Sequence, residues 1–583
     1  MASSRDFLVL ALLCYLQIST AKVVTHHFNI GWINAAPDGY MRPVVAINGE
    51  FPPPTLHVTT GDELVIHTIN NLGNSSATLH FHGLWQQGGT AQDGPFQVSQ
   101  CGIPAEQSFT YRFLVKQPGT YFYHSHFQGQ YPDGLRAPLI VHDPDSPYAD
   151  SYDEEKVITL SDWYHDQMPN LLSYYLNSTL NPDSPEPIPY SALLNDRQNV
   201  PLQVQPNKAY FLRIINFAAF SQIYLHFDEH EMIIIEVDGN TSKHNYAALA
   251  KLDETMFDGY PDIPPEVNPN VNAWLVYDPS LPLPPPLNIS LDTLNSTIID
   301  DFTLVPYDNE PLLENPTQTF VLELSFFPQD GQNRAGFNGI TWLPQKVPSL
   351  FTALTTGSAA TENLTYGANA HAMVLNYNEV IEVVINNFDS GGHPIHLHGH
   401  APQLGKIFTH LAAPISYYKQ MLSTILARSS NGTYDPSKEK HAYMLPPQPG
   451  SQYIMPAADV LGYNRDTVPM PKIPVKRDTR MLAAQGYTVI RFRANNPGVW
   501  FFHCHMDWHN IAGLAATFIE APLELQKTQY IPYASKDNFL KQDMPVAGNA
   551  AGNTRNFSDL TGAVTSCPPL PLFTGTPPIL NKA

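Results

Sequence analysis

Four short histidine clusters near the two ends of the chain constrain its fold more than any other feature of the sequence. They occur in LHFHGL, YHSHFQG, HPIHLHGH and FHCHMDWH. Side chains alternate between the faces of a β-strand, so both histidines of an H-x-H pair point to one side, about 7 Å apart. Four such pairs supply eight imidazoles to one polynuclear metal site. The clustered residues are His80, His82, His124, His126, His393, His396, His398, His400, His503, Cys504, His505 and His509.

The same alternation gives the last cluster access to two sites. If His503 and His505 face one way, Cys504 faces the other, so one strand touches two metal centres. A thiolate with two imidazoles is the ligand set of a blue copper electron-transfer centre, and His393 and His509 are available as the imidazoles. Zinc is the alternative, but a zinc site takes three or four ligands and does not require eight further histidines in pairs.

Composition and patterning indicate an all-β chain of several units. The 583 residues exceed what one hydrophobic core holds, and 54 prolines with 34 glycines favour short strands and turns. Runs such as ELVIHTIN, RAPLIVHD and FVLELSFF alternate apolar and polar residues, as β-sandwich strands do. The net charge of −22 disfavours nucleic acid and an anionic membrane surface as partners.

The N-terminal residues 1–21 resemble a secretory signal peptide. Arg5 precedes the apolar run Phe7 to Leu16, and small residues stand before a cleavage point after Ala21. No later stretch offers about 18 uninterrupted apolar residues, so we expect no membrane helix in this sequence. The eight N-x-S/T sequons are typical of the secretory pathway and predict an extracellular location or the outer face of the plasma membrane. They begin at Asn74, Asn177, Asn240, Asn288, Asn295, Asn363, Asn431 and Asn556.

Three cysteines remain once the signal peptide, with Cys14, is removed. Cys504 is a candidate metal ligand, which leaves Cys101 and Cys567 to form a disulfide in an oxidising compartment. Two separate buried thiols are the alternative.

The four clusters together resemble the copper-binding motifs of the multicopper oxidases, the family of laccases, ascorbate oxidases and ferroxidases. The resemblance spans nearly the whole chain and implies three consecutive cupredoxin-like Greek-key β-sandwich domains holding four copper ions. The type 1 copper would be held by His393, Cys504 and His509. Eight histidines would hold the other three ions: His80 and His396 the type 2 copper, His82, His124 and His505 one type 3 copper, and His126, His398 and His503 the other. His400 has no ligand counterpart.

The resemblance also assigns roles to three residues beside the coppers. Leu514 stands where some family members have an axial methionine, and a side chain that does not coordinate should raise the potential of the type 1 copper. Asp93 and Asp507 match acids that relay protons to reduced oxygen.

Within the family, the chain is most similar to the fungal ferroxidases that work beside an iron permease. The phrases ITLSDWYH, DETMFD and NNFDSGGHPIHLHGH carry this resemblance, which implies that Glu186, Asp258 and Asp389 bind Fe(II) beside the type 1 histidines. Carboxylate oxygens suit this hard cation and stabilise its ferric product. The alternatives are a laccase that oxidises phenols and a copper-binding protein without turnover.

The expected domains are residues 22–145, residues 146–305 and residues 306–583, the last with the type 1 site and a C-terminal tail. The second domain is shortened, because only NYAALAK separates EVDGNTSK from LDETMFD where we expect roughly two further strands. Residues 407–428 match nothing in the family, and we interpret them as an unspliced intron.

Overall fold

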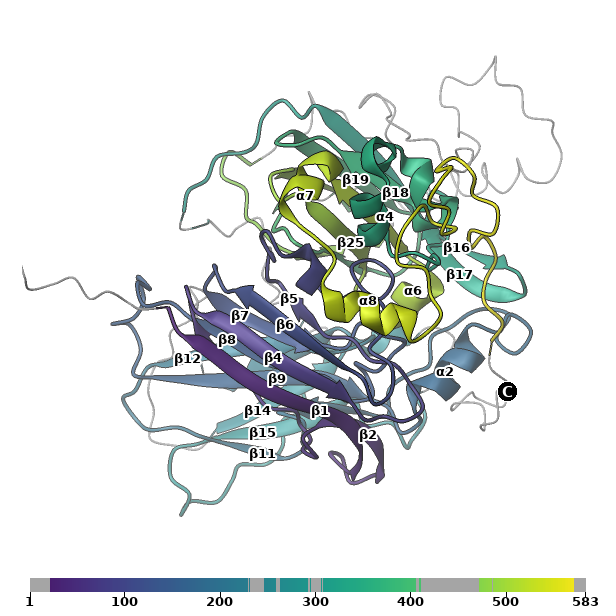
Figure 1. Cartoon of the computed structure of the whole chain (residues 1–583). Coiled ribbons are helices and arrows are strands. Elements are labelled where there is room, and N and C mark those ends of the chain that lie inside the picture. The colour runs from purple at the N-terminus through teal and green to yellow at the C-terminus, as the bar shows by residue number, and fades with distance from the viewer. Residues whose placement is uncertain are drawn as a thin grey trace, which may run out of the picture.

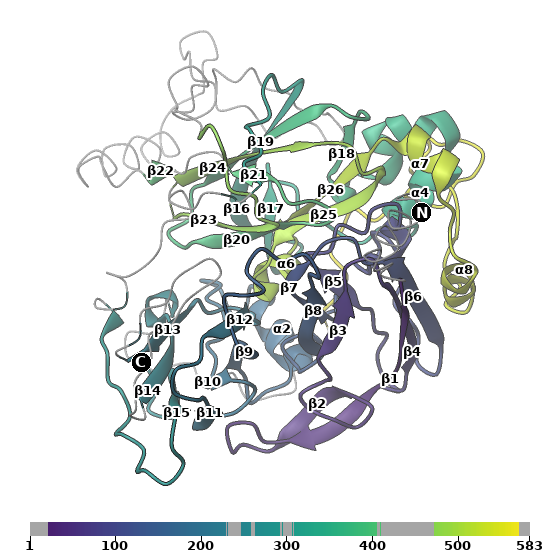
Figure 2. The same cartoon turned by 90° about the vertical axis from the view of Figure 1, so that its left-hand side faces the viewer.

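The computed structural model describes residues 21–228, 230, 246–257, 263–291, 294, 306, 308–404, 408–409, 471–484 and 486–570. Strands dominate these residues and pair into six sheets. Figures 1 and 2 show that the C-terminal third of the chain lies over the first and second thirds, which stand side by side beneath it. Residues 1–20 of the predicted signal peptide and Asp258, together with most of the segment 407–428, lie outside the described residues.

Two four-stranded sheets pack face to face in the first unit. Their orders are β2-β1-β4-β6 and β3-β8-β7-β5. In β6 the sequence SFTYRFL alternates strictly, so that Phe109, Tyr111 and Phe113 enter the core while their neighbours face solvent. The elements are β1 (Val23–Ala35), β2 (Arg42–Ile47), β3 (Leu56–Thr59), β4 (Glu63–Asn70), β5 (His80–His82), η1 (Thr90–Gln92), β6 (Ser108–Leu114), β7 (Gly119–His124) and β8 (Arg136–His142).

The second unit has a three-stranded sheet, β10-β9-β12, and a four-stranded sheet, β11-β15-β14-β13. The stretch that we considered too short contributes β14, which pairs with β13 on one side and with β15 on the other. The elements are β9 (Glu154–Trp163), α2 (Met168–Tyr175), β10 (Ser191–Leu194), β11 (Val200–Gln203), β12 (Tyr210–Asn216), β13 (Ile223–Phe227), β14 (Tyr246–Leu252), η2 (Glu254–Met256) and β15 (Asn270–Val276).

The third unit pairs the sheet β17-β16-β19-β24-β21, which β22 joins through β24, with the sheet β18-β26-β25-β20-β23. Its strands are β16 (Gln318–Gln329), β17 (Gln332–Phe337), β18 (Ala372–Leu375), β19 (Val380–Asn387), β20 (His393–Leu397), β21 (Gln403–Leu404), β22 (Phe408–Thr409), β23 (Thr479–Leu482), β24 (Gly486–Arg493), β25 (Gly498–Cys504) and β26 (Ala515–Glu520). Its helices are α4 (Ser349–Thr355), η4 (Gly357–Thr361), η5 (Asn363–Tyr366), η6 (Ala368–Ala370), α6 (Asp507–Ala512), α7 (Pro522–Thr528) and α8 (Tyr533–Leu540).

Apolar packing joins the units. One continuous core cluster includes Leu160 of the second unit and Phe518 of the third, and another joins Val98 of the first unit to Phe351 of the third. Within the described residues, none of the helices combines the length and the hydropathy of a membrane span.

The predicted disulfide between Cys101 and Cys567 is wrong, because the structure has both residues as free thiols. Cys101 is 2% exposed and packs in the core cluster shared by the first and third units. Cys567 belongs to the C-terminal segment and donates its backbone N–H to Asp330 in the β16–β17 turn, 2.9 Å away. The two remaining cysteines therefore satisfy separate local environments.

Candidate metal centres

Two strands of the third unit carry candidate ligands for two sites at once. β20 and β25 are antiparallel, with Ile395 opposite Cys504 and His396 opposite His503. Ile395 and Cys504 belong to the large apolar core, and His396 and His503 lie on the other face of the sheet. One pair of strands thus separates a thiol-containing site from a histidine site.

The three-donor site consists of His393, Cys504 and His509, which are all buried. The Cys504 Sγ lies 3.5 Å from the His509 Nδ1 and 3.9 Å from the His393 Nδ1, and the two nitrogens are 3.1 Å apart. Leu514 is fully buried, donates its N–H to the His509 carbonyl and accepts the Cys504 N–H. A soft thiolate with two imidazoles in a dry pocket suits copper.

Charge at this site is set by contacts inside the trio. Burial opposes ionisation of Cys504, but hydrogen bonds with His393 and His509 outweigh it and lower the pKa of the thiol to about 6. Burial likewise opposes protonation of His509, but contacts with Cys504 and Glu186 raise its pKa. The cysteine is therefore held as a thiolate, which is the form that binds metal.

Two predicted acids reach the outer edges of these imidazoles. The Glu186 Oε1 is 2.7 Å from the His509 Nε2, and the Asp389 Oδ2 is 3.1 Å from the His393 Nε2. Their side chains are 18% and 36% exposed, so both carboxylates connect a buried ring to solvent. Burial opposes ionisation of Asp389, but the contact with His393 outweighs burial, lowers the pKa of Asp389 and keeps this group ionised.

Eight histidines from both ends of the chain converge between the first and third units. Ligand nitrogens lie within 4.8 Å of one another in three overlapping groups: His80, His82 and His124; His80, His396 and His398; and His126, His398 and His503. The His503 Nε2 is 3.1 Å from the His398 Nε2 and 3.4 Å from the His126 Nε2. His505 joins through its Nε2, 3.1 Å from the His82 Nδ1.

Alternation within β5 explains how the first unit contributes. Phe81 points into the core, where its ring is 4.8 Å from that of Phe113, and the flanking His80 and His82 turn to the opposite face. β5 pairs with β7, which places His80 opposite His124. The His82 and His124 ring centroids are 6.1 Å apart, and those of His124 and His505 are 5.4 Å apart.

Hydrogen bonds on the outer nitrogens orient these rings. The Nδ1 atoms of His80, His124, His396 and His503 lie 2.7–2.9 Å from backbone carbonyls of Asp93, Ser125, Asp478 and Cys504. A carbonyl only accepts, so each Nδ1 donates and the lone pair stays on Nε2. The Nε2 atoms of His80, His124 and His396 are buried with no partner among the described residues. Inward-facing, unpaired imidazole nitrogens are the donor set that copper ions fit.

Burial keeps six histidines of this cluster uncharged. Burial, followed by repulsion from neighbouring histidines, lowers the pKa of His126 to about 3. The same causes lower the pKa values of His124, His396, His398, His503 and His505 well below the usual value. Neutral imidazoles are ready to bind cations without first losing a proton.

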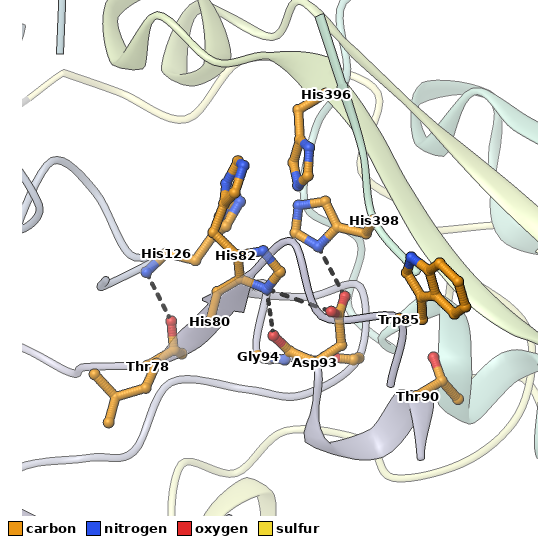
Figure 3. A network of polar contacts seen from close by, with 12 residues as sticks. Thr78, His80, His82, Trp85, Thr90, Asp93, Gly94, His126, His396 and His398 are labelled. Atoms are coloured by element: carbon orange, nitrogen blue, oxygen red, sulfur yellow. Dashed lines mark hydrogen bonds and ion pairs between the residues drawn. The ribbon is translucent and has the colours of Figure 1, made fainter. Parts of the chain in front are cut away.

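Asp93 is a buried carboxylate beside the cluster. Its Oδ2 is 2.8 Å from the His398 Nδ1 and its Oδ1 is 3.3 Å from the His80 Nδ1, and Figure 3 shows both rings directed at it. Complete burial raises the pKa of Asp93, although His80 opposes the shift. The residue therefore links two predicted ligands on different units.

Asp507 lies at the start of α6, facing the second unit. Its backbone N–H donates to the Ala219 carbonyl, and its Oδ2 has no hydrogen-bond partner among the described residues. Burial, reinforced by the charges of Asp133 and Asp162, raises its pKa to about 7. A carboxyl group that titrates near neutrality can both hold and release a proton.

Asp478 is a functional candidate that sequence reasoning missed. Its Oδ1 lies 3.1 Å from the His82 Nε2, and its backbone carbonyl accepts the His396 Nδ1–H. The His82 Nδ1 faces His505, so Asp478 contacts the outward nitrogen of that ring. A single acid in KRDTRM carries no local signal of this role. The Nε2 of His400, for which we expected no ligand role, lies 3.0 Å from the Oε2 of the buried Glu520.

Comparison with known proteins gives consistent matches along the chain. The family described as multicopper oxidase matches residues 29–146, residues 154–249, and residues 342–411 with 425–524. The interruption at residues 412–424 falls inside the segment 407–428, for which we expected no match, and the family model matches the two ends of that segment.

Curated proteins and solved structures match over nearly the full length. Iron transport multicopper oxidase FET3 of Gibberella zeae is 43% identical, covering 94% of this chain and 84% of its own. FET3 of Saccharomyces cerevisiae is 34% identical, covering 96% and 85%. The crystal structure of Fet3p, described as a multicopper oxidase that functions in iron import, superposes with a TM-score of 0.79 at 33% identity over 92% of this chain and 98% of that one. A laccase from Botrytis aclada, at 23% identity and a TM-score of 0.67, shares the fold.

Proposed function

The chain belongs to the multicopper oxidase family, and we propose that it oxidises Fe(II) to Fe(III) and reduces O₂ to water. Four Fe(II) ions, one O₂ and four protons give four Fe(III) ions and two waters. The family binds copper, and we assign four ions to this chain: one at His393, Cys504 and His509, and three at the eight-histidine cluster. Bound copper supplies one-electron acceptance at the first site and four-electron reduction of oxygen at the second.

The contact of Glu186 and Asp389 with the outer nitrogens of His509 and His393 carries the iron assignment. Each imidazole bonds a carboxylate with its Nε2 and faces the thiol group with its Nδ1. An Fe(II) ion bound by these carboxylates is one aromatic ring away from the three-donor site. Hard carboxylate oxygens suit iron and favour the ferric product, so the acids both bind the donor and assist its oxidation. Asp258 is proposed as a third iron ligand on sequence resemblance alone.

The sequence His503–Cys504–His505 joins the two sites covalently. Cys504 belongs to the three-donor site, and its two neighbours belong to the histidine cluster. Oxygen reduction at the cluster consumes protons in a buried place, and Asp93 and Asp507 are the acids assigned to supply them. Burial raises the pKa values of both carboxyl groups, which favours their protonated forms.

The relatives named for iron transport support iron uptake as the physiological role. On this basis we assign the protein to the secretory pathway and the cell surface, with an iron permease as its partner. The experiment that tests the donor is steady-state oxygen consumption by the copper-loaded protein with Fe(II) or with a phenol. It compares wild type with the double variant Glu186→Gln/Asp389→Asn and with the control Glu524→Gln/Asp537→Asn, which changes two exposed acids on α7 and α8.

We expect the Glu186→Gln/Asp389→Asn variant to lose iron turnover while its phenol turnover and blue colour survive. The control variant should retain both activities. If the double variant oxidises iron as fast as wild type and phenol is the better donor, the protein is a laccase and the iron assignment is wrong.

A further inference from the structure

Two histidines outside the proposed copper sites bring their ring nitrogens together at the end of the first unit that lies away from the histidine cluster. His57 lies in β3 and His142 ends β8. The strands are parallel with His57 opposite Ile140, so His142 lies two residues further along on the same face. The His57 Nδ1 is 3.2 Å from the His142 Nε2, and the rings are tilted by only 11° with centroids 5.5 Å apart.

This spacing fits a shared metal ion. Zinc binds histidine nitrogens at about 2.0–2.1 Å, so two nitrogens of a tetrahedral site are roughly 3.3 Å apart. Both rings are accessible to solvent, with the His142 side chain 41% exposed, and water can complete the coordination. Imidazole is a ligand that Cu(II) and Zn(II) share.

A carboxylate orients one of the rings. The Glu155 Oε2 lies 3.7 Å from the His142 Nδ1 and favours a proton on that nitrogen, which leaves the Nε2 lone pair directed at His57. Glu155 is itself fixed by Arg213, whose Nε and Nη2 donate to it at 2.8 and 3.1 Å, and by the Tyr152 hydroxyl at 2.8 Å. A ligand pair with an anchored acid behind it resembles the outer shell of many metal sites.

The pair is separate from the copper cluster. β8 begins at Arg136, which is paired with His124, and reaches His142 six residues later. At about 3.3 Å per residue along β8, His142 is roughly 20 Å from His124 of the histidine cluster. The pair also lies on the border with β9 of the second unit, which supplies Glu155.

We propose that His57 and His142 form a surface binding site for a divalent transition-metal ion, Cu(II) or Zn(II), with the His57 Nδ1 and the His142 Nε2 as its ligands. The ion connects β3 to β8 and, through Glu155, lies against the second unit. This site is independent of the iron and oxygen chemistry proposed above.

Isothermal titration of the fully copper-loaded protein with zinc chloride tests the site. The variants are His57→Gln, His142→Gln and Glu155→Gln, and the matched control is His67→Gln. His67 is also exposed and stacks on His27 with centroids 4.9 Å apart, but its Nδ1 lies 3.0 Å from the Thr110 hydroxyl. An unchanged blue colour shows that each variant is folded and loaded.

We expect wild type to bind one zinc ion that His57→Gln and His142→Gln both eliminate, and that Glu155→Gln weakens roughly tenfold. The control should bind zinc as wild type does. The proposal is overturned if wild type has no saturable zinc site, if His57→Gln leaves the binding unchanged, or if His67→Gln reduces it equally. In those cases the short nitrogen–nitrogen distance is an ordinary hydrogen bond.

Discussion

The three-donor site and the histidine cluster share one strand but treat charge in opposite ways. In the first, carboxylates and a thiolate surround the rings, and the pKa values of His393 and His509 are raised despite burial. In the second, backbone carbonyls hold four of the eight rings, and burial lowers pKa values, as for His126. The outer nitrogens of the first site lead to partly exposed acids, whereas those of the second lead mainly into the protein. On the proposed function, the first site would meet a cation from solvent, and the second would hold several cations away from it.

The largest effect should come from replacing Cys504, which belongs to the three-donor site and whose chain neighbours, His503 and His505, belong to the histidine cluster. Cys504→Ser replaces a soft thiolate with a hydroxyl that is a poor copper ligand. We expect complete loss of iron-dependent oxygen uptake and of the blue colour, with copper content reduced by one ion per chain. Copper analysis and oxygen electrode measurements check this. Residual iron oxidation above the uncatalysed rate would mean that electrons enter the cluster directly.

Asp93→Asn should impair oxygen reduction at the histidine cluster and leave electron uptake at the three-donor site unchanged. The amide cannot carry the proton and replaces one of the two carboxylate oxygens, which face the Nδ1 atoms of His398 and His80, with an N–H donor. We expect reoxidation of the reduced enzyme by O₂ to slow roughly 100-fold. Anaerobic stopped-flow reduction of the blue centre by Fe(II) should proceed at the wild-type rate. Equal slowing of both half-reactions would show that the two sites do not work independently.

The two carboxylates beside the three-donor site should contribute unequally to iron oxidation. Glu186 is closer to its histidine than Asp389 is, 2.7 against 3.1 Å, and is less exposed, so water screens it less. We expect Glu186→Gln to lower kcat/KM for iron roughly tenfold and Asp389→Asn to lower it less. Steady-state kinetics at fixed oxygen concentration measure both. The reverse order would place the main electron entry at His393.

Acid should destabilise the copper-free protein through the cluster. The six histidines with lowered pKa values stay neutral when folded but take up protons near pH 6.5 when unfolded. The unfolded state then binds more protons, so stability falls as pH drops below about 6.5, by up to about 1.4 kcal/mol per pH unit for each such histidine. The urea concentration at the midpoint of unfolding should fall between pH 7 and pH 5, and this fall should be smaller for His126→Gln than for wild type. Equal falls would show that His126 is already protonated in the folded protein.

Much of both sites could be predicted because the constraint is local. The alternation of β-strands fixes the facing of His80 and His82 around Phe81, and of His503 and His505 around Cys504, before any tertiary structure is known. The all-β class follows from the same alternation. The β-strand at Tyr246–Leu252 was missed because we judged that stretch from the length expected of relatives and not from its own pairing.

Contacts between distant segments could not be predicted in this way. Asp478 reaches His82 across 396 positions, and nothing in its own neighbourhood marks it. The disulfide failed for a related reason: pairing the leftover cysteines ignored that Cys101 is fully packed among apolar side chains. Side chains that act through tertiary contacts leave no periodic signal in the sequence.

The smallest effect should come from Leu514, an uncharged residue beside the three-donor site. Its fully buried side chain stands at the predicted axial position, and its backbone bonds to Cys504 and His509 hold that position in place. Leu514→Met conserves volume, so the cost in stability should stay below about 1.5 kcal/mol. A thioether adds weak donation to the copper and should lower its reduction potential. Redox titration of the blue absorption measures the shift. A lower potential reduces the driving force for electron transfer from Fe(II), and about 1.4 kcal/mol of driving force corresponds to one factor of ten in an equilibrium constant. We expect the loss to stay below this amount, so iron turnover should fall by less than about tenfold. An unchanged potential would mean that residue 514 lies too far from the metal to coordinate it, and that the thiolate and the carboxylates alone distinguish this site from the cluster.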